Sequence, residues 1–272
     1  MNARIPLAVG LGLLLLVTGC GEPDSRTEPG AAPAWSSAPS PTPEATTGPV
    51  PTPAATPSPT RTSPPPPPPV RPRPTALPAG LRKTTGVRGV ALTFDDGPDP
   101  VYTPRILDQL REAKVKATFC VVGTRARRHP ELVARIAREG HQLCNHSWQH
   151  DMDLGRRPLA AIRADLKRTN KAIRAAVPDA KIPFYRQPGG RWTAEVVAVA
   201  KQLDMRSLHW TVDPQDWAKP TAATLTKRVH KAVRPGAVVL LHDGGGDRTA
   251  TVTACPRLIT EIKDRYGITK AR

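Results

Sequence analysis

Two adjacent carboxylates, Asp95 and Asp96, stand at the end of a short apolar run over residues 90–94. This run predicts a β-strand, and Gly97-Pro98 ends it with turn residues. In α/β folds, ligands and catalytic groups collect at this edge of the sheet. Adjacent acids repel, so the pair needs a cation or a shared proton. Taken alone, the two acids are better explained as the start of a solvated turn, and the case for chemistry depends on residues further along.

A pair of histidines, His146 and His150, follows a second apolar run over 141–145. Two histidines four residues apart lie on one face of a helical turn, close enough to bind one metal ion. A surface pair or a partner for an acidic residue is the alternative. With Asp96 they form a set of three protein ligands, which leaves a position open for water as in catalytic zinc sites. Other transition metals accept the same donors.

Polar residues also mark the ends of three more predicted strands. They are Arg186, before Gln187-Pro188-Gly189-Gly190; Asp213, which opens Asp213-Pro214-Gln215-Asp216-Trp217; and His242, before Asp243 and three glycines. A single histidine followed by aspartate is more often structural than catalytic. Five strand ends that all carry groups suited to one hydrolytic site are hard to assign to chance.

Six apolar runs are predicted as strands, at 90–94, 117–122, 141–145, 182–186, 206–211 and 237–241. Between them, apolar residues at helical spacing predict helices after Pro158 and around Val196, Leu225 and Leu258. This alternation indicates a parallel sheet, open or closed into a barrel. Six strands are few for a regular eight-stranded barrel, so an irregular barrel fits better.

Residues 1–20 have the pattern of an export signal, with Arg4, an apolar run over 7–17 and then Cys20. The run is shorter than the about 20 residues that cross a bilayer and suits a signal-peptide core. Val17-Thr18-Gly19-Cys20 resembles the lipobox of bacterial lipoproteins, in which the cysteine is lipidated. An ordinary cleaved signal with an unrelated cysteine is the alternative.

Residues 21–80 are predicted to be a disordered linker. Twenty of the 58 residues at 21–78 are proline, and most others are Ala, Ser or Thr. Such a segment cannot bury enough apolar surface to offset its chain entropy. At about 3.1 Å per residue it would reach on the order of 180 Å when extended. Residues 81–272 remain, enough for one well-cored domain.

The charge of this domain is strongly positive. Residues 81–272 hold 35 Lys and Arg against 19 Asp and Glu, a net charge of 35 − 19 = +16. A domain this basic should dwell near anions, such as wall polymers or anionic lipid headgroups. The basic residues are spread over many segments and form no nucleic-acid-binding motif, so we expect no nucleic-acid partner.

Three cysteines lie in the domain, at Cys120, Cys144 and Cys255. The first two fall near the ends of neighbouring predicted strands, so a disulfide between them is conceivable in an exported chain. Connectivity does not follow from sequence, and three buried free thiols are the alternative.

The five polar segments resemble, in order, the five motifs of the polysaccharide deacetylases, the carbohydrate esterases with the NodB homology domain. The segments are Thr93-Phe94-Asp95-Asp96, His146-Ser147-Trp148-Gln149-His150, Arg186-Gln187-Pro188, Asp213-Pro214-Gln215-Asp216-Trp217 and Leu240-Leu241-His242-Asp243. The resemblance runs from about Thr84 to the C-terminus. It implies a distorted (β/α) barrel that removes N- or O-acetyl groups from sugars with a divalent metal.

The resemblance also implies a role for each residue. Asp96, His146 and His150 would bind the metal, with zinc expected and cobalt or nickel as alternatives. Asp95 would be the general base toward a metal-activated water. His242 would protonate the leaving sugar nitrogen.

Further residues would support this chemistry. The backbone N–H at Gly189 would help to hold the oxyanion, Arg186 would orient Asp95 and keep it ionised, and Asp213 would hold His242 charged. Leu240 and Trp217 resemble the apolar walls of the acetyl pocket. The family often has an aromatic residue where this chain has Gly189, a change that would reshape the sugar groove.

Together, the sequence predicts an exported, monomeric deacetylase, lipid-anchored to the outer face of the cytoplasmic membrane and reaching into the cell wall. Its partner would be an N-acetylated glycan, with peptidoglycan N-acetylglucosamine as the leading substrate. Chitin oligomers and O-acetylated xylan are alternative substrates. A non-catalytic wall-binding lipoprotein is the alternative from another functional class.

Overall fold

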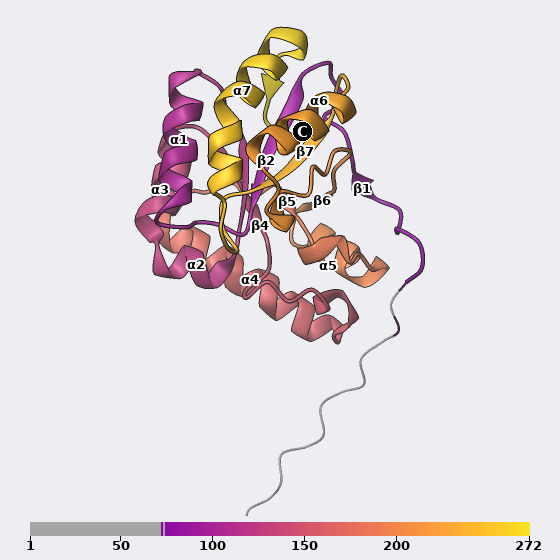
Figure 1. The fold of residues 1–272 in the computed structure, drawn as a ribbon. Coiled ribbons are helices and arrows are strands. Elements are labelled where there is room, and N and C mark those ends of the chain that lie inside the picture. Colours follow the sequence, from indigo (N-terminus) through magenta and orange to yellow (C-terminus); the bar gives the residue numbers. More distant parts are fainter. Residues whose placement is uncertain (1–71, 73) are drawn as a thin grey trace, which may run out of the picture. The chain divides into compact units, whose positions relative to one another are not determined.

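A computed structural model describes residue 72 and residues 74–272, which form a parallel β-sheet with helices packed around it (Figure 1). The predicted export signal, the lipidation site Cys20 and nearly all of the predicted linker lie outside the described residues. Within the described part, none of the helices combines the length and apolar character that a membrane span requires.

The elements follow one another in a largely alternating order. The strands are β1 (Leu81–Arg82), β2 (Val90–Asp95), β3 (Thr118–Val121), β4 (Gln142–Asn145), β5 (Phe184–Tyr185), β6 (Arg206–Leu208), β7 (Val238–His242) and β8 (Ile268–Thr269). The α-helices are α1 (Tyr102–Glu112), α2 (Gly123–Arg128), α3 (Pro130–Arg138), α4 (Leu159–Ala176), α5 (Ala194–Gln202), α6 (Ala222–Ala232) and α7 (Thr249–Tyr266). Three 3₁₀ turns are η1 (Leu154–Arg156), η2 (Pro188–Gly190) and η3 (Asp216–Ala218).

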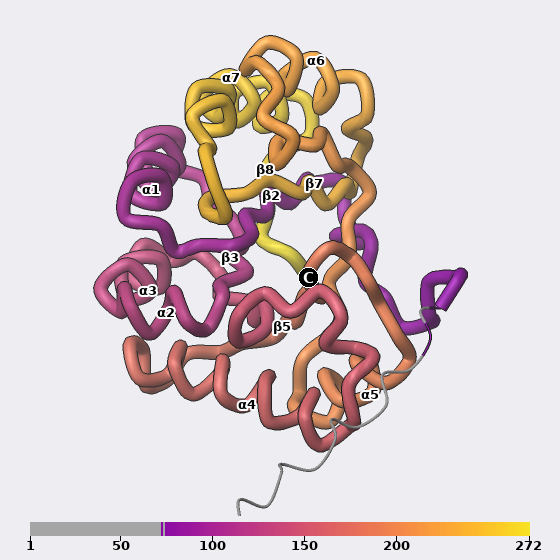
Figure 2. The backbone as a smooth tube through the Cα atoms, turned by 60° about the horizontal axis from the view of Figure 1, so that its bottom comes forward, coloured from indigo at the N-terminus to yellow at the C-terminus, as the bar shows by residue number. Residues whose placement is uncertain are grey.

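The sheet curves into an irregular barrel. Its strand order is β1-β6-β5-β4-β3-β2-β7, and β8 pairs with β2. Two isolated bridges connect the β7 end of this order to the other side of the sheet: Thr84, which follows β1, pairs with Ala237, and Val212, which follows β6, pairs with Val239. A seam of single bridges is weaker than a full ladder, so the barrel is closed but distorted. Figure 2 shows helices around most of the strands. The predicted distorted (β/α) barrel is confirmed.

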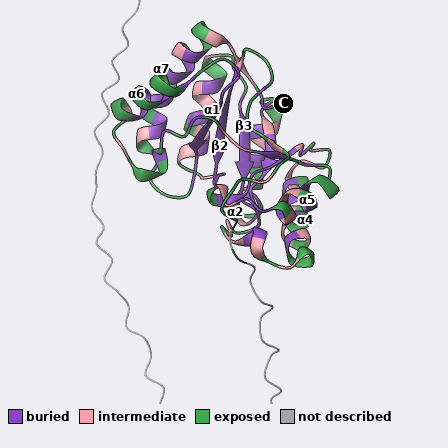
Figure 3. Cartoon of the chain, turned by 90° about the vertical axis from the view of Figure 1, so that its right-hand side faces the viewer, coloured by how far each residue is buried: buried purple, intermediate pink, exposed green. Residues whose placement is uncertain are grey.

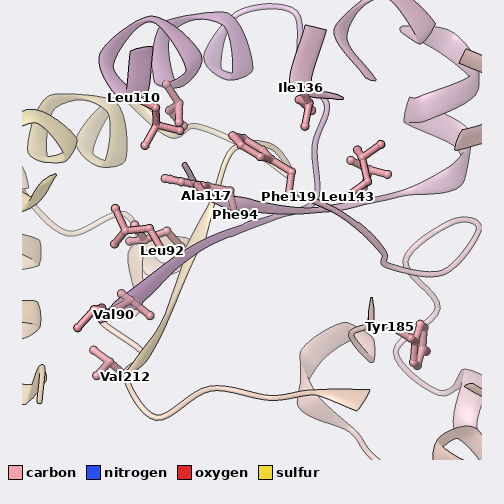
Figure 4. Packing of buried hydrophobic residues seen from close by; sticks show 14 of the residues in the cluster. Val90, Leu92, Phe94, Leu110, Ala117, Phe119, Ile136, Leu143, Tyr185 and Val212 are labelled. Carbon is pink, nitrogen blue, oxygen red and sulfur yellow. The ribbon is translucent and has the colours of Figure 1, made fainter. Parts of the chain in front are cut away.

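Side chains of β2 alternate between the barrel interior and the helical layer. Val90, Leu92 and Phe94 belong to the main core cluster between sheet and helices, where Phe94 stacks on Phe119 with 5.2 Å between ring centroids (Figure 4). Ala91 belongs to the smaller cluster inside the barrel. Burial is concentrated in the strands and on the inner faces of the helices (Figure 3). Asp95 therefore faces inward, as the alternation requires.

The strand register brings distant residues to one edge. Asp95 at the end of β2 is the register partner of His242 on β7 and of Cys120 on β3. Cys120 in turn pairs with Cys144 on β4, and these two cysteines form a disulfide, while Cys255 is buried with a free thiol. The structure therefore has the disulfide rather than three free thiols.

Candidate active site

A cavity of about 520 Å³ opens at the carboxyl edge of the barrel strands. Of the ten domain residues predicted for the site, all except Arg186 line it: Asp95, Asp96, His146, His150, Gly189, Asp213, Trp217, Leu240 and His242. This is the position at which barrel enzymes place their catalytic groups, because the loops after the strands converge there.

Three of these side chains could hold a metal ion. The ligand atoms of Asp96, His146 and His150 lie within 4.8 Å of one another. Asp96 Oδ1 is 3.3 Å from Nε2 of His146 and 3.2 Å from Nε2 of His150. This oxygen is buried and has no hydrogen-bond partner among the described residues. A buried carboxylate oxygen left open between two imidazole nitrogens fits a divalent cation bound by the three residues.

The surroundings of the three ligands suit this use. His146 Nδ1 lies 2.8 Å from the carbonyl oxygen of Arg186, so Nδ1–H donates there and Nε2 keeps its lone pair for the cation. Burial alone would raise the pKa of Asp96, but the neighbouring His146, His242 and His150 lower it well below the ordinary value. The carboxylate therefore stays ionised and able to bind a cation.

The two histidines are not on a helical turn, and that part of the prediction is wrong. Residues 146–150 form a loop in which Ser147 and His150 adopt positive φ values of 64° and 62°. The loop places the imidazole centroids 5.1 Å apart. Asn145 anchors it: its Oδ1 accepts the Ser147 N–H at 3.0 Å, and its Nδ2 donates to Asn170 of α4 at 2.8 Å. Asn145 directly precedes the ligand pair in the sequence, but its role as an anchor was not predicted.

Asp95 is tied to Arg186 at the floor of the site. Nη1 of Arg186 donates to Asp95 Oδ1 at 2.7 Å and to Thr93 Oγ1 at 2.8 Å, and Nε donates to the Leu208 carbonyl at 3.1 Å. Arg186 is fully buried, which is why it does not line the cavity. Asp95 Oδ2 lies 3.7 Å from His146 Nε2. One oxygen of Asp95 is thus held in place, and the other faces the candidate metal site.

His242 is held by Asp216, not by Asp213, so the predicted partner is wrong. Nδ1 of His242 donates to Asp216 Oδ1 at 2.6 Å, and the backbone N–H of His242 donates to Oδ2 at 2.8 Å. Thr251 Oγ1 donates to the same Oδ2 at 2.8 Å. Burial would lower the pKa of His242, but Asp216 raises it to about 9, so the imidazole is protonated at neutral pH.

The local backbone explains why Asp216, and not Asp213, contacts His242. Gln215 adopts a left-handed conformation with φ of 57°, and the 3₁₀ turn η3 then carries Asp216 inward, where it is buried. Asp213 remains exposed at the cavity rim, and its Oδ1 accepts the Gln215 N–H at 2.8 Å. An aspartate that bonds the backbone two residues on stabilises a turn. Asp213 therefore shapes the loop that presents Asp216.

The remaining predicted residues form the walls. Leu240 is buried, whereas Trp217 is half exposed, at 51%. Gly189 has a φ of 60°, and a Cβ there would lie 3.0 Å from Sδ of Met152. The side chain of Met152 therefore lies against Gly189, at the position where the polysaccharide deacetylases were expected to carry an aromatic residue.

A turn after β7 supports Asp96 from behind. Asp243 is buried; it accepts the Gly97 N–H at 3.2 Å and the Thr103 hydroxyl at 2.6 Å. Burial raises the pKa of Asp243 to about 7. Gly245 has a φ of 78°, and a Cβ there would lie 2.2 Å from Asp96 Oδ2. The run of glycines after His242 was visible in the sequence, but its contact with Asp96 was not.

Comparison with known proteins agrees with this geometry. A family model described as polysaccharide deacetylase matches residues 82–208. The chain is 39% identical over 200 residues to a chitooligosaccharide deacetylase of Sinorhizobium fredii, covering 70% of this chain and 93% of the relative. It is 38% identical over 176 residues to a peptidoglycan-N-acetylglucosamine deacetylase of Bacillus cereus, covering 64% of this chain and 81% of the relative.

A solved structure with a similar fold is a CE4 family pseudoenzyme from Bacillus anthracis, with a TM-score of 0.66 and 29% identity over 71% of this chain and 68% of that one. In the present chain, the three candidate metal ligands, the Asp95–Arg186 pair and the His242–Asp216 pair meet in one cavity. The chain therefore belongs to the polysaccharide deacetylase family of amide hydrolases and carries a candidate Asp-His-His metal site.

Proposed function

We propose that this protein removes N-acetyl groups from N-acetylglucosamine of peptidoglycan, using a divalent metal and water. The observation that supports this most is the placement of Asp95, paired with the buried Arg186, and a protonated histidine, His242, in one cavity beside the candidate metal ligands. Amide hydrolysis needs a base for the attacking water and an acid for the leaving nitrogen. The cavity holds one of each.

The metal would be bound by Asp96, His146 and His150. When bound, a divalent cation would polarise the acetyl carbonyl and make a water molecule more acidic. Zinc is the expected ion because two imidazoles and one carboxylate suit it, and cobalt or nickel would accept the same donors.

Asp95 would take the proton from the attacking water. Arg186 holds Oδ1 at 2.7 Å, so the orientation of the carboxylate is fixed and Oδ2 is the oxygen that accepts the proton. The backbone N–H of Gly189 would donate to the developing oxyanion, because a donor placed before the reaction needs no reorganisation.

His242 would then donate a proton from Nε2 to the leaving sugar nitrogen. Its Nδ1–H is committed to Asp216, which leaves Nε2 as the nitrogen that faces the cavity. An amine is too basic to depart as an anion, so this transfer completes the cleavage. Leu240 and Trp217 would enclose the acetyl methyl group.

Two observations support peptidoglycan as the substrate. A basic domain favours an anionic wall over neutral chitin, and one relative carries the name of a peptidoglycan deacetylase. The chitooligosaccharide deacetylase name of another relative keeps chitin oligomers as the main alternative, with O-acetylated xylan as a third.

The test is acetate release from wall glycan, chitin oligomers and acetylated xylan of matched acetyl content. We expect release that is fastest on wall glycan, stops with chelator, returns with zinc and falls at least about 10²-fold in Asp95→Asn. Acetate release that persists in the chelator or in Asp95→Asn would refute the mechanism. Glycan binding with no release under any metal would favour the non-catalytic class that the similar pseudoenzyme represents.

We also propose that the protein is exported and anchored to the outer face of the cytoplasmic membrane through lipidated Cys20, with the Pro-rich segment as a spacer into the wall. The support is the sequence pattern of residues 1–80. Cys20→Ser should move the protein from the membrane fraction to the soluble exported fraction. Unchanged membrane association of this variant would refute the anchor.

A further inference from the structure

A buried arginine that takes no part in the proposed reaction lines the same cavity. Arg248, at the start of α7, is only 4% exposed and borders the cavity together with Asp96 and Gly245. Nε of Arg248 donates to the carbonyl oxygen of Gly244 at 2.7 Å, and Nη1 donates to that of Asp247 at 3.0 Å. Two carbonyl groups therefore fix the plane of the guanidinium.

Among the described residues, the positive charge of Arg248 has no counter-anion. Within residues 74–272 no carboxylate lies at ion-pair distance from it, and Nη2 has no acceptor. Arg186, the other deeply buried arginine discussed above, pairs with Asp95 at 2.7 Å. A buried charge is normally paired, because removing it from water is unfavourable unless another charge compensates it. Nη2 lies beside Gly246, 3.7 Å from where a Cβ would be, so no side chain of that residue covers it.

A second cation borders the adjoining cavity. Arg125 on α2 lines a space of about 270 Å³ together with Asp96, His150 and Gly245, which also line the main cavity. Its guanidinium lies close to Gly244, 2.5 Å from where a Cβ would be. No described group accepts a hydrogen bond from the side chain of Arg125 or forms an ion pair with it. Both arginines thus lie against the segment from Gly244 to Gly246, next to the candidate metal site.

The acidic residues that line the cavity do not neutralise the charges of Arg248 and Arg125. Asp95 is neutralised by Arg186, and Asp96 faces the two histidines. Asp213 is exposed at the rim and accepts from the Gln215 backbone. The fork of N–H groups on a guanidinium matches the two oxygens of a carboxylate and binds it more strongly than a neutral acceptor.

We propose that Arg248 and Arg125 bind a carboxylate carried by the glycan, on the acetylated sugar or on the sugar beside it, so that the enzyme selects acidic glycans over neutral ones. This inference rests on the proposed deacetylase function and assigns its substrate class. Such a carboxylate has two chemical sources, a lactyl ether as in muramic acid or the C6 acid of a uronic sugar. Both present the same planar group to the arginines.

The test compares substrates that differ only in this charge. Metal-loaded full-chain protein is assayed for acetate release on an oligosaccharide in which N-acetylglucosamine alternates with N-acetylmuramic acid, and on the same oligosaccharide with its carboxylates converted to amides. We expect kcat/KM to be at least about tenfold higher on the carboxylate form, mainly through KM. An oligosaccharide with uronic acid in place of the muramic acid, compared with its own amide, shows which source is recognised.

The variants test the two arginines through the ratio of kcat/KM on the carboxylate and amide forms. In Arg248→Gln and Arg125→Gln this ratio should fall at least about threefold toward one. Arg248 also holds two carbonyl groups, so Arg248→Lys, which keeps the charge but loses the fork, is measured beside it. Arg257→Gln is the control: it removes the same charge from α7, where the side chain is 74% exposed and pairs with Glu261, and should leave the ratio unchanged.

The outcomes distinguish failure of the proposed carboxylate recognition from failure of the proposed deacetylase function. Equal kcat/KM of the unmodified protein on both members of both substrate pairs overturns the inference while the deacetylase function stands. A ratio that survives in Arg125→Gln and in the Arg248 variants overturns it as well, and so does a ratio that Arg257→Gln lowers equally. No acetate release from any of these substrates, with metal present, overturns the proposed function itself.

Discussion

His242 and Asp216 are joined by two hydrogen bonds, one from the imidazole and one from the backbone. Nδ1 of His242 donates to Oδ1 of Asp216 at 2.6 Å, and the His242 N–H donates to Oδ2 at 2.8 Å. The same carboxylate therefore fixes the ring and the strand end that carries it. A buried acid in this position keeps the imidazole charged, and this charge is what a proton donor to a leaving amine requires.

The pH dependence of the reaction should follow from this pair. The pKa of His242 is raised to about 9 in the folded protein, so the proton is present at neutral pH and is lost as the pH rises through about 9. Acetate release should fall along that alkaline limb. In Asp216→Asn the nearest anion is gone and only the weaker influence of Asp96 and Asp95 opposes burial, so the pKa of His242 drops and the limb should move to lower pH by roughly 1–3 units. The measurement is kcat as a function of pH.

Asp213→Asn is the matched control, because it makes the same change in the same loop. Asp213 forms no hydrogen bond or ion pair with His242 and accepts the Gln215 N–H, an interaction that Asn can replace. The alkaline limb of Asp213→Asn should stay near that of the unmodified protein. A larger shift in Asp213→Asn than in Asp216→Asn would contradict the assignment.

The glycine run after His242 should control metal affinity. A Cβ at Gly245 would lie 2.2 Å from Asp96 Oδ2, so Gly245→Ala should displace this ligand and weaken zinc binding by about tenfold or more, measured by titration calorimetry. Gly86→Ala is the control, since Gly86 also has a positive φ, of 75°, but a Cβ there meets nothing within 4 Å. Both variants bear a backbone strain of about 1–2 kcal/mol, and only the first should lose zinc affinity.

Removal of Arg186 should cost stability as well as activity. Arg186→Met leaves the buried Asp95 carboxylate without its 2.7 Å partner, and breaking such a pair from one side costs about 3–5 kcal/mol. Urea unfolding should show this loss in the free energy of unfolding. Arg257→Met, on the exposed face of α7, should change it by less than about 0.5 kcal/mol. Equal values for the two variants would show that Asp95 does not depend on Arg186.

The disulfide should stabilise the barrel by restricting the unfolded chain. Cys120 and Cys144 are 24 residues apart, and a loop of this length corresponds to about 3–4 kcal/mol in the chain-entropy model. The double variant Cys120→Ser/Cys144→Ser should lose about this much. Reductant should lower the melting temperature of the unmodified protein and leave the double variant unchanged; an equal effect of reductant on both would show that it does not act through this disulfide.

The sequence predicted the site better than its supporting contacts. Asp96, His146 and His150 could be identified because they are the residue types that bind metals, and each follows an apolar run. The partner of His242 could not, because Asp213 and Asp216 lie in one loop and only the left-handed Gln215 decides which one turns inward. Likewise, a spacing of four residues suggested a helical turn at His146, where a loop anchored by Asn145 gives the same proximity.

The fold shows a similar division. The six longer apolar runs are all strands, although their ends differ from the predicted ones. β1 and β8 have two residues each and were missed, whereas β5, which is equally short, lies within the predicted apolar run at 182–186. Helices α1, α2 and α3 were left out of the prediction, yet in α1 Ile106, Leu107 and Leu110 lie on one buried face at helical spacing. The helical signal was therefore present in the sequence, whereas β1 and β8 lie in no apolar run that would predict a strand.

The far end of the chain has a practical consequence. β8 pairs with the first residues of β2, at the end of the barrel away from Asp95, and the following Ala271 is buried inside, its N–H donating to Thr118 Oγ1 at 3.2 Å. A purification tag fused after Arg272 would disturb the packing of β8 and Ala271 and destabilise this end of the barrel. A tag placed before β1 would leave both the packing of Ala271 and the cavity at the carboxyl edge of the strands undisturbed.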